Sequence, residues 1–197
     1  MYELPTSITI GDRQYQITNE GDYRVVLDCF RALSDNELSE DEQVLASLLI
    51  FYNEFTDLDD LPNDQDIVNG LITEMCKFFN CGQEDSIGAS SSQQVIDWDG
   101  DSTIIAAAIN NVAHTEIRSV PYCHWWTFMG YYMSIGESVL STVVGIRDKL
   151  NRGKELEKWE REFKAQNPHY FNWKKKTAEQ LELDEYVRNL WNNGGVL

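Results

Sequence analysis

Residues 122–133 read Tyr-Cys-His-Trp-Trp-Thr-Phe-Met-Gly-Tyr-Tyr-Met, and we expect the protein to fold around this segment. Apolar side chains recur in it at steps of three and four residues, the spacing of a helix face. They make two stripes, one of Trp125, Phe128, Met129 and Tyr132 and one of Tyr122, Trp126 and Met133. A helix that is apolar around most of its surface is a buried helix. The sequence therefore predicts a core helix over 122–133, with Ser119 as its N-cap and Pro121 in its first turn.

The segments on both sides of this helix predict further helices, each with one apolar face. Ser39 and Glu42 form the pattern of a capping box, in which each side chain accepts a hydrogen bond from the backbone amide of the other residue. The predicted helices run from Asp22 to about Leu33, from Ser39 to about Asn53, from Gln65 to Phe79, from the acids before Ile104 to Val112, and from Ser138 to Leu150.

The beginning of the chain predicts a β-hairpin. Residues 6–10 and 14–18 alternate apolar with polar side chains and flank Gly11-Asp12-Arg13. An isolated hairpin is only marginally stable in water, so this one must pack against the helices. The predicted fold class is therefore mainly α, a helical domain with a small N-terminal β-hairpin.

The composition divides the chain into four parts. Residues 1–81 hold the hairpin and the first helices, and residues 82–94, rich in glycine and serine, predict a flexible loop. Residues 95–166 form the helical core, and 167–197 a C-terminal helical tail. Within the last two parts we predict helices over 154–166 and 178–192. A chain of this length can fold as one compact domain.

The charge of the chain excludes some partners. The net charge is −17 and the pI is near 4.4. Such a chain repels nucleic acid and anionic membranes, so we expect neither as a partner. No apolar run approaches the roughly 20 residues that span a bilayer, and we expect a cytoplasmic protein with its four cysteines reduced.

Residues 147–176 differ from the rest of the chain in the sign of their charge. They contain ten Lys and Arg against five acids, a local charge of +5 that leaves −22 elsewhere. Aromatic residues lie among the basic ones, so three interpretations are open: a solvated helix face with internal ion pairs, a face that docks a protein, and a nucleic-acid groove. A docked protein would be an acidic partner or the acidic body of a second subunit. The residues that we predict to bind a partner are Arg147, Lys154, Lys158, Trp159 and Arg161.

Three aspartates in the sequence have a spacing that could indicate a metal site. Asp97, Asp99 and Asp101 alternate as the ligands of a calcium loop do. Such a loop needs Gly at its sixth position and Glu at its twelfth, where this chain has Ser102 and Ala108. We therefore favour capping of the following helix, where negative charge is stabilising, over an ion site.

Cysteine and histidine residues give no stronger sign of a catalytic or metal centre. Cys76, Cys81, Cys123 and His124 could supply four zinc ligands, but the four-residue spacing between cysteines occurs only once. Buried cysteines and a packed or hydrogen-bonded His124 are the simpler interpretation. The chain has no glycine-rich phosphate loop, no Gly-x-Ser-x-Gly and no His-Glu-x-x-His motif. We expect no enzymatic activity, no metal and no cofactor.

Several motifs together resemble the bacteriophage gene-product-fifteen family. They follow one another from about Leu4 to Ala165, and the His-Trp-Trp-x-Phe core is the most specific of them. The family usually has Leu where this chain has Cys123, and the tail after Asn167 has no matching pattern. The motifs are Leu4-Pro-x-x-Ile-x-Ile-Gly11, Asp22-Tyr23-Arg24, Ile96-Asp-Trp-Asp-x-Asp101, Cys123-His-Trp-Trp-Thr-Phe128 and Ile146-Arg147.

This resemblance implies a product of a tailed phage or prophage, encoded beside the tail tape-measure gene. It implies a non-enzymatic tail assembly chaperone that binds the tape-measure protein and the tail tube protein in the host cell cytoplasm. One alternative is a minor structural protein that stays in the virion. Another is a metal-dependent enzyme that uses the aspartate segment or the Cys and His residues. Self-association is left open.

Overall fold

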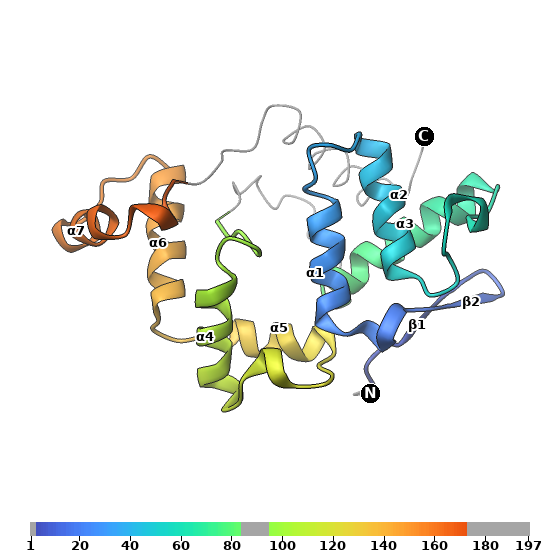
Figure 1. Cartoon of the computed structure of the whole chain (residues 1–197), viewed down its shortest axis with the longest axis horizontal. Helices are drawn as coiled ribbons and strands as arrows, with labels where there is room; N and C mark the ends of the chain where they lie inside the picture. Colours follow the sequence, from blue (N-terminus) through green and yellow to red (C-terminus); the bar gives the residue numbers. More distant parts are fainter. Residues whose placement is uncertain (1–2, 84–94, 173–197) are drawn as a thin grey trace. The chain divides into compact units, whose positions relative to one another are not determined.

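The computed structural model describes residues 3–83 and 95–172, which form seven α-helices and one two-stranded antiparallel sheet (Figure 1). The predicted fold class, mainly α with an N-terminal hairpin, is confirmed. The chain divides into two compact units: unit 1, with described residues 3–83 and 122–129, and unit 2, with described residues 95–121 and 130–172. In these described ranges no helix combines the length and the apolar character needed to cross a membrane. The predicted helix over 178–192 and most of the predicted loop over 82–94 lie outside them.

Unit 1 begins with the predicted hairpin, formed by β1 (Ser7–Ile10) and β2 (Arg13–Gln16). Ile8 pairs with Tyr15, and both side chains are buried because alternate residues of a strand face the same side. Gly11 occupies the turn at φ +58°, a conformation that glycine adopts without strain. The hairpin packs on the third helix, where Gly70 leaves room for Ile10.

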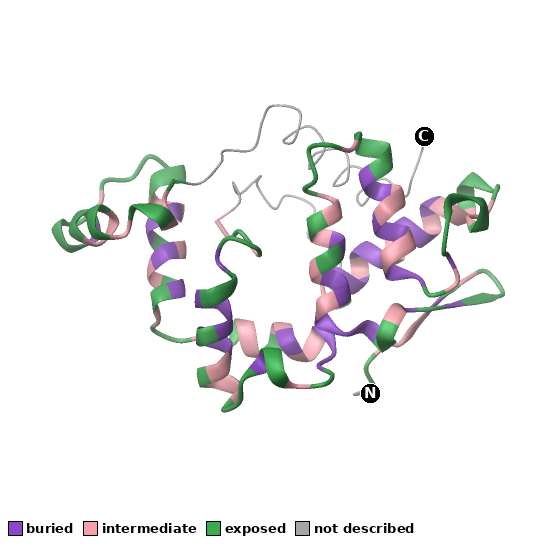
Figure 2. Cartoon of the chain, viewed as in Figure 1, coloured by how far each residue is buried: buried purple, intermediate pink, exposed green. Residues whose placement is uncertain are grey.

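Three helices complete most of unit 1: α1 (Tyr23–Ala32), α2 (Glu40–Phe51) and α3 (Gln65–Phe79). Their bounds agree with the predicted helices, and α2 has the predicted capping box, with a 2.8 Å bond from the Ser39 amide to Glu42. Their inward sides carry the buried residues (Figure 2). The ring of Phe51 lies 5.2 Å from that of Phe78 and 5.5 Å from that of Phe79, so aromatic packing fills the centre of this unit.

The aromatic helix α5 (Trp125–Met133) begins three residues later than predicted, and Ser119 is not its N-cap. Residues 123 and 124 are instead extended. The amide of Tyr23 donates to the Cys123 carbonyl (2.9 Å), and the amide of Cys123 donates to the Asp22 carboxylate (2.9 Å). This pairing holds Cys123 out of the helix that its apolar spacing predicted.

Fewer side chains of α5 are buried than the sequence predicted. Only Trp125 and Phe128 are buried within the helix, whereas Met133 is 66% exposed. The indole nitrogen of Trp125 donates to the carbonyl of Phe79 (2.9 Å), and Phe128 stacks on Tyr23 with ring centroids 4.4 Å apart. The first half of the helix is therefore a core element of unit 1, as the sequence indicated, but the whole helix is not.

Unit 2 contains α4 (Ser102–Ala113), α6 (Val139–Asn151) and α7 (Lys158–Gln166), with the 3-10 turns η3 (Ile117–Ser119) and η4 (Pro168–Tyr170). The helices α4 and α6 pack against each other. Their buried side chains form the apolar centre of this unit and are chiefly Ile105, Ile109, Val143 and Ile146.

The last described helix, α7, begins at Lys158 and not at the predicted Lys154. Gly153, at φ +64°, ends α6 in a Schellman motif. The amide of Lys154 donates back to the Lys149 carbonyl (2.8 Å), and the amide of Gly153 donates to the Leu150 carbonyl (3.1 Å). The chain therefore turns at 153–154 before α7 starts.

Candidate partner-binding site

The five residues predicted to bind a partner lie in two different environments. Lys158, Trp159 and Arg161 are exposed at the start of α7, with Trp159 51% exposed, and Lys154 is exposed in the segment before the helix. Arg147 is buried within α6, on the face that packs inside unit 2. Partner binding by these residues stays a prediction, and only the four exposed side chains offer a charged or aromatic surface.

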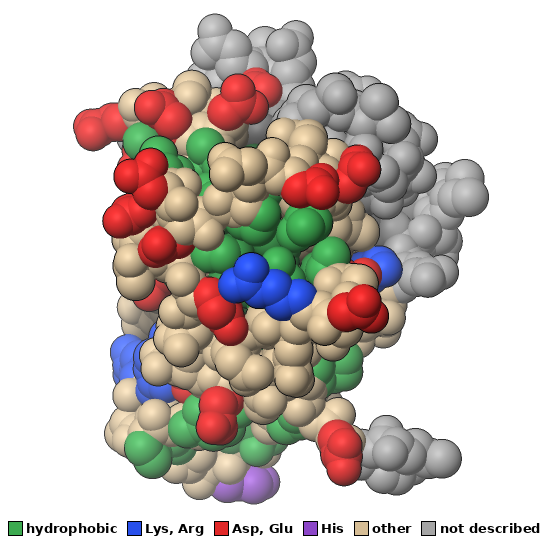
Figure 3. Space-filling view, turned by 90° about the vertical axis from the view of Figure 1, so that its right-hand side faces the viewer, with side chains coloured by type: hydrophobic (Ala, Val, Ile, Leu, Met, Phe, Trp, Pro, Cys, Tyr) green, Lys and Arg blue, Asp and Glu red, His purple; other side chains and the backbone are tan. Residues whose placement is uncertain are grey.

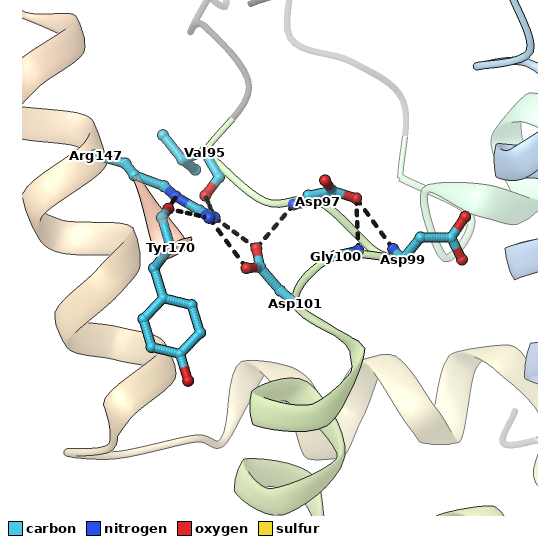
Figure 4. Close-up of polar contacts among 7 residues, drawn as sticks. All are labelled: Val95, Asp97, Asp99, Gly100, Asp101, Arg147 and Tyr170. Carbon is cyan, nitrogen blue, oxygen red and sulfur yellow. Dashed lines mark hydrogen bonds and ion pairs between the residues drawn. The ribbon is translucent and has the colours of Figure 1, made fainter. Parts of the chain in front are cut away.

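Arg147 holds three segments of unit 2 together (Figure 4). Its Nη1 donates to the Asp101 carboxylate and to the carbonyl of Val95 (3.0 Å). Its Nη2 donates to the other oxygen of Asp101 (3.0 Å) and to the carbonyl of Tyr170 (2.6 Å), to which Nε also donates (3.0 Å). The arginine and aspartate side chains are 9% and 2% exposed. This buried clamp fixes α6 to the start of α4 and to η4.

The aspartates before α4 accept hydrogen bonds from backbone amides and from Arg147. Asp97 accepts hydrogen bonds from the amides of Asp99 (3.2 Å) and Gly100 (2.9 Å), which closes a tight turn (Figure 4). Asp101 stands at the N-cap position of α4 but makes no capping hydrogen bond with its side chain. The predicted capping is therefore wrong for Asp101, because its carboxylate binds Arg147 and the amide of Asp97 (3.0 Å) instead.

A second ion pair attaches α7 to α6. Lys149 Nζ lies 2.6 Å from Glu160, which is buried at the start of α7. The hydrogen bond from Lys149 lowers the pKa of Glu160 below its ordinary value, so the carboxylate stays charged. Glu160 also accepts from the amide of Glu157 (2.8 Å) and so caps α7. Together with the clamp at Tyr170, this pair holds α7 in a fixed place in unit 2.

The segment around α7 presents an aromatic ring among exposed charges of both signs, because Glu155, Glu157 and Glu162 are exposed beside the basic residues. The indole nitrogen of Trp159 donates to Glu157 (2.9 Å), which orients the exposed ring. Lys158 lies 3.9 Å from Glu162, a loose contact between exposed side chains. Within residues 3–83 and 95–172, Lys154, Arg161 and Lys164 have no carboxylate within ion-pair distance.

Unit 1 carries a strong negative charge. Its described residues include 17 Asp and Glu against four Lys and Arg, and no Lys or Arg occurs from residue 32 to residue 76. Figure 3, which faces the side with α2, α3 and the hairpin, shows hydrophobic side chains around a basic one, with acidic side chains about them. The loop between α2 and α3 presents Leu58, which is 58% exposed and which no sequence pattern had singled out.

His124 is buried and fully hydrogen bonded in unit 1. Its Nδ1 accepts from the amide of Trp126 (3.0 Å), so Nε2 carries the proton and donates to the Pro5 carbonyl (3.0 Å). Burial lowers the pKa of His124 below its ordinary value, so the ring is neutral at pH 7. The predicted packed and hydrogen-bonded histidine is what the structure has.

The four cysteines are free thiols, and Cys29, Cys76 and Cys123 are buried. Desolvation by burial raises the pKa of Cys123 to about 11, so its thiol is protonated and unreactive at pH 7. In the part of the chain that the structure describes, no three His, Cys, Asp or Glu side chains gather as ligands for a metal ion.

A family model described as Bacteriophage Gp15 protein matches residues 1–171. No curated protein and no solved structure matches the chain.

Four of the motifs that resemble the family contact one another in two pairs. The aspartate segment reaches Ile146-Arg147 through the ion pair of Asp101, and Asp22-Tyr23 pairs with Cys123-His124. Each of these contacts is a structural one, made by buried side chains or backbone. These contacts therefore account for the motifs by the way each unit is built.

Proposed function

The chain belongs to the bacteriophage Gp15 protein family, and on that basis we propose that it is a non-enzymatic tail assembly chaperone. In this role it binds the tail tape-measure protein in the host cell cytoplasm and covers segments of it until tail tube protein replaces the chaperone. The observation that carries the proposal is the family match over residues 1–171.

The surface of the chain has the properties that such a role requires. A chaperone for a long, aggregation-prone protein must offer apolar contact and must keep the complex in solution. Net charge far from zero keeps proteins soluble, and this chain has −17. Large apolar side chains are nevertheless exposed in both units, namely Leu4, Leu58 and Tyr122 in unit 1 and Met133, Val139, Leu150 and Trp159 in unit 2.

Co-expression with the tape-measure protein encoded beside this gene tests the proposal. We expect the tape-measure protein to enter the soluble fraction only when this chain is present, and a tagged chain to pull it down. The matched control is another acidic phage protein of similar size, expressed at the same level. A tape-measure protein whose solubility does not depend on this chain, and which is not retained with it, would overturn the proposal.

Mass spectrometry of purified particles distinguishes the chaperone from the alternative, a minor structural protein of the virion. A chaperone is absent from finished particles, whereas a structural component is present in fixed stoichiometry. Stoichiometric recovery of the chain from particles would therefore replace the chaperone assignment with the structural one.

A further inference from the structure

We propose that the connection between α5 and α6 in unit 2 is a docking surface for apolar segments that carry a single lysine or arginine (Figure 1). We call this surface the α5–α6 corner and define it as Met133, Ile135, Glu137 and Val139. The partner is the tape-measure protein of the proposed function, on which this inference rests. The corner adds where on the chain a tape-measure segment binds and which chemistry that segment has.

The α5–α6 corner exposes apolar side chains within a short stretch of chain. Met133 is 66% exposed and Val139 is 49% exposed, and the half-buried Ile135 lies between them in sequence. Among the large hydrophobic residues that the structure describes, Met133 is the most exposed. Methionine is unbranched and adapts its shape, and proteins that bind many apolar partners use it for this reason. Covering these side chains with an apolar segment removes their surface from water, which favours binding.

Two glycines leave space beside Met133. Gly130 precedes Met133 by three residues on α5, so the two residues lie on the same side of the helix. Gly136 lies in the connection itself. A Cβ added at either glycine would meet no neighbouring atom within 4 Å in the part of the chain that the structure describes. A bound segment can therefore approach the backbone on both sides of the exposed methionine.

Local contacts hold the corner in one conformation. The amide of Ile135 donates to the carbonyl of Tyr132 (3.2 Å), and the Tyr132 ring packs on Trp98 with centroids 5.4 Å apart. Ser138 and Ser141 form a capping box at the start of α6, with a 3.0 Å bond from the Ser141 amide to the Ser138 hydroxyl. A preformed surface loses little conformational entropy when a partner binds.

The charge of the corner defines the partner. Glu137 is the only Asp, Glu, Lys or Arg in residues 119–146, although 25% of the whole chain is charged. It is exposed, and in the described ranges no Lys or Arg lies within ion-pair distance of it. An apolar surface with one free carboxylate complements an apolar segment with one cation. The net charge of −17 disfavours an acidic segment further.

Pull-down of the co-expressed tape-measure protein gives the first test. The double variant Met133→Ser, Val139→Ser should retain less of it than the wild-type chain by about tenfold or more, because two apolar side chains no longer contribute to the contact. Leu58→Ser is the matched control, since it replaces an exposed apolar side chain in unit 1, and it should retain the wild-type amount. Full retention by the double variant would overturn the corner as the binding surface and leave the proposed function standing.

Synthetic peptides test the chemistry of the corner without the tape-measure protein. The probes are two labelled helical peptides with the same leucine face, one with a single Lys beside it and one with Glu in that position. Fluorescence anisotropy at low salt measures their affinity for the purified chain. The wild-type chain should bind the Lys peptide about fivefold more tightly than the Glu peptide, the size of effect expected for one exposed ion pair.

Reversal of the charge at residue 137 gives the decisive result. Glu137→Lys should prefer the Glu peptide, and Met133→Ser, Val139→Ser should bind both peptides more weakly by about tenfold or more. All these side chains are exposed, so the circular dichroism spectra should not change. A wild-type chain that binds neither peptide overturns the inference, and so does a peptide preference that is the same in Glu137→Lys. Neither result decides the proposed function, whose test requires the tape-measure protein.

Discussion

Replacement of Arg147 by Met tests how unit 2 is held together. Methionine keeps most of the volume of the side chain and removes its charge and all of its hydrogen-bond donors. The substitution leaves the Asp101 carboxylate buried without its arginine, and it deprives the carbonyls of Val95 and Tyr170 of their donors. The loss therefore falls on three separate segments of the unit.

The size of the effect follows from the burial of the pair. Breaking a buried ion pair by removing one partner costs about 3 to 5 kcal/mol, because a charge remains in the interior without compensation. The Asp101 side chain is only 2% exposed, so water cannot replace the lost arginine without opening the unit. A typical domain is stable by about 5 to 15 kcal/mol, so this single change removes a large part of the total.

Urea denaturation followed by circular dichroism measures the change in the free energy of unfolding. The matched control is Arg152→Met on the same helix, because Arg152 forms an exposed pair with Asp148 (2.8 Å). Exposed pairs of this kind contribute about 0.3 to 0.5 kcal/mol. In the double variant Asp101→Asn, Arg147→Met no charge is left buried, so it should be more stable than Arg147→Met by about 2 kcal/mol.

Equal destabilisation by Arg147→Met and Arg152→Met would refute this reasoning. It would mean that the network in Figure 4 contributes no more than a surface contact. A double variant less stable than Arg147→Met would also contradict it, because the penalty would then not arise from the unpaired carboxylate.

Three further predictions concern unit 1. Trp125→Ala should lower the free energy of unfolding, measured by urea denaturation, by about 3 to 5 kcal/mol. Trp159→Ala, at an exposed site, should lower it by less than about 0.5 kcal/mol. Similar values for the two variants would contradict the burial of Trp125. Burial lowers the pKa of His124 from its ordinary 6.5, so the unfolded chain takes up a proton at a higher pH than the folded chain, and the free energy of unfolding should fall as the pH drops below about 6.5. His124→Gln should flatten this pH dependence. An unchanged slope in the variant would assign the dependence to other groups. Gly21→Ala should lower the melting temperature far more than Gly11→Ala. Both glycines have positive φ, but only at Gly21 would the new Cβ lie 2.7 Å from a neighbouring ring, that of Phe78. Equal decreases in the melting temperature would mean that backbone strain alone matters.

Local sequence signals predicted most helices and failed where distant residues intervene. The capping box at Ser39 and the apolar spacing over 65–79 act within a few residues, and both helices have the expected bounds. The start of α5 depends on Asp22, which is 101 residues from Cys123 in sequence. No periodicity or capping rule contains such a contact, so the pattern predicted helix where the chain is extended.

The candidate site was predictable in part for the same reason. Charge and aromatic content identified the exposed residues of α7, whose composition alone marks them as surface. Arg147 was predicted as a binding residue because it belongs to the same basic segment. Its partner Asp101 lies 46 residues away in sequence, and the pairing of the two side chains buries both. Leu58 was not selected because a single leucine in an acidic loop has no pattern that separates exposed from buried.

Residues 32–76 of unit 1 contain no Lys or Arg, and this determines how mass spectrometry can detect the protein. Trypsin cleaves after Lys and Arg, so it releases residues 32–77, which hold α2, most of α3 and the loop with Leu58, as one long acidic peptide, and residues 78–118 as another. Peptides of this length and charge ionise and fragment poorly. A protease that cuts at Asp or Glu divides the same region at many points, so a search of virions for this chain should use such an enzyme beside trypsin.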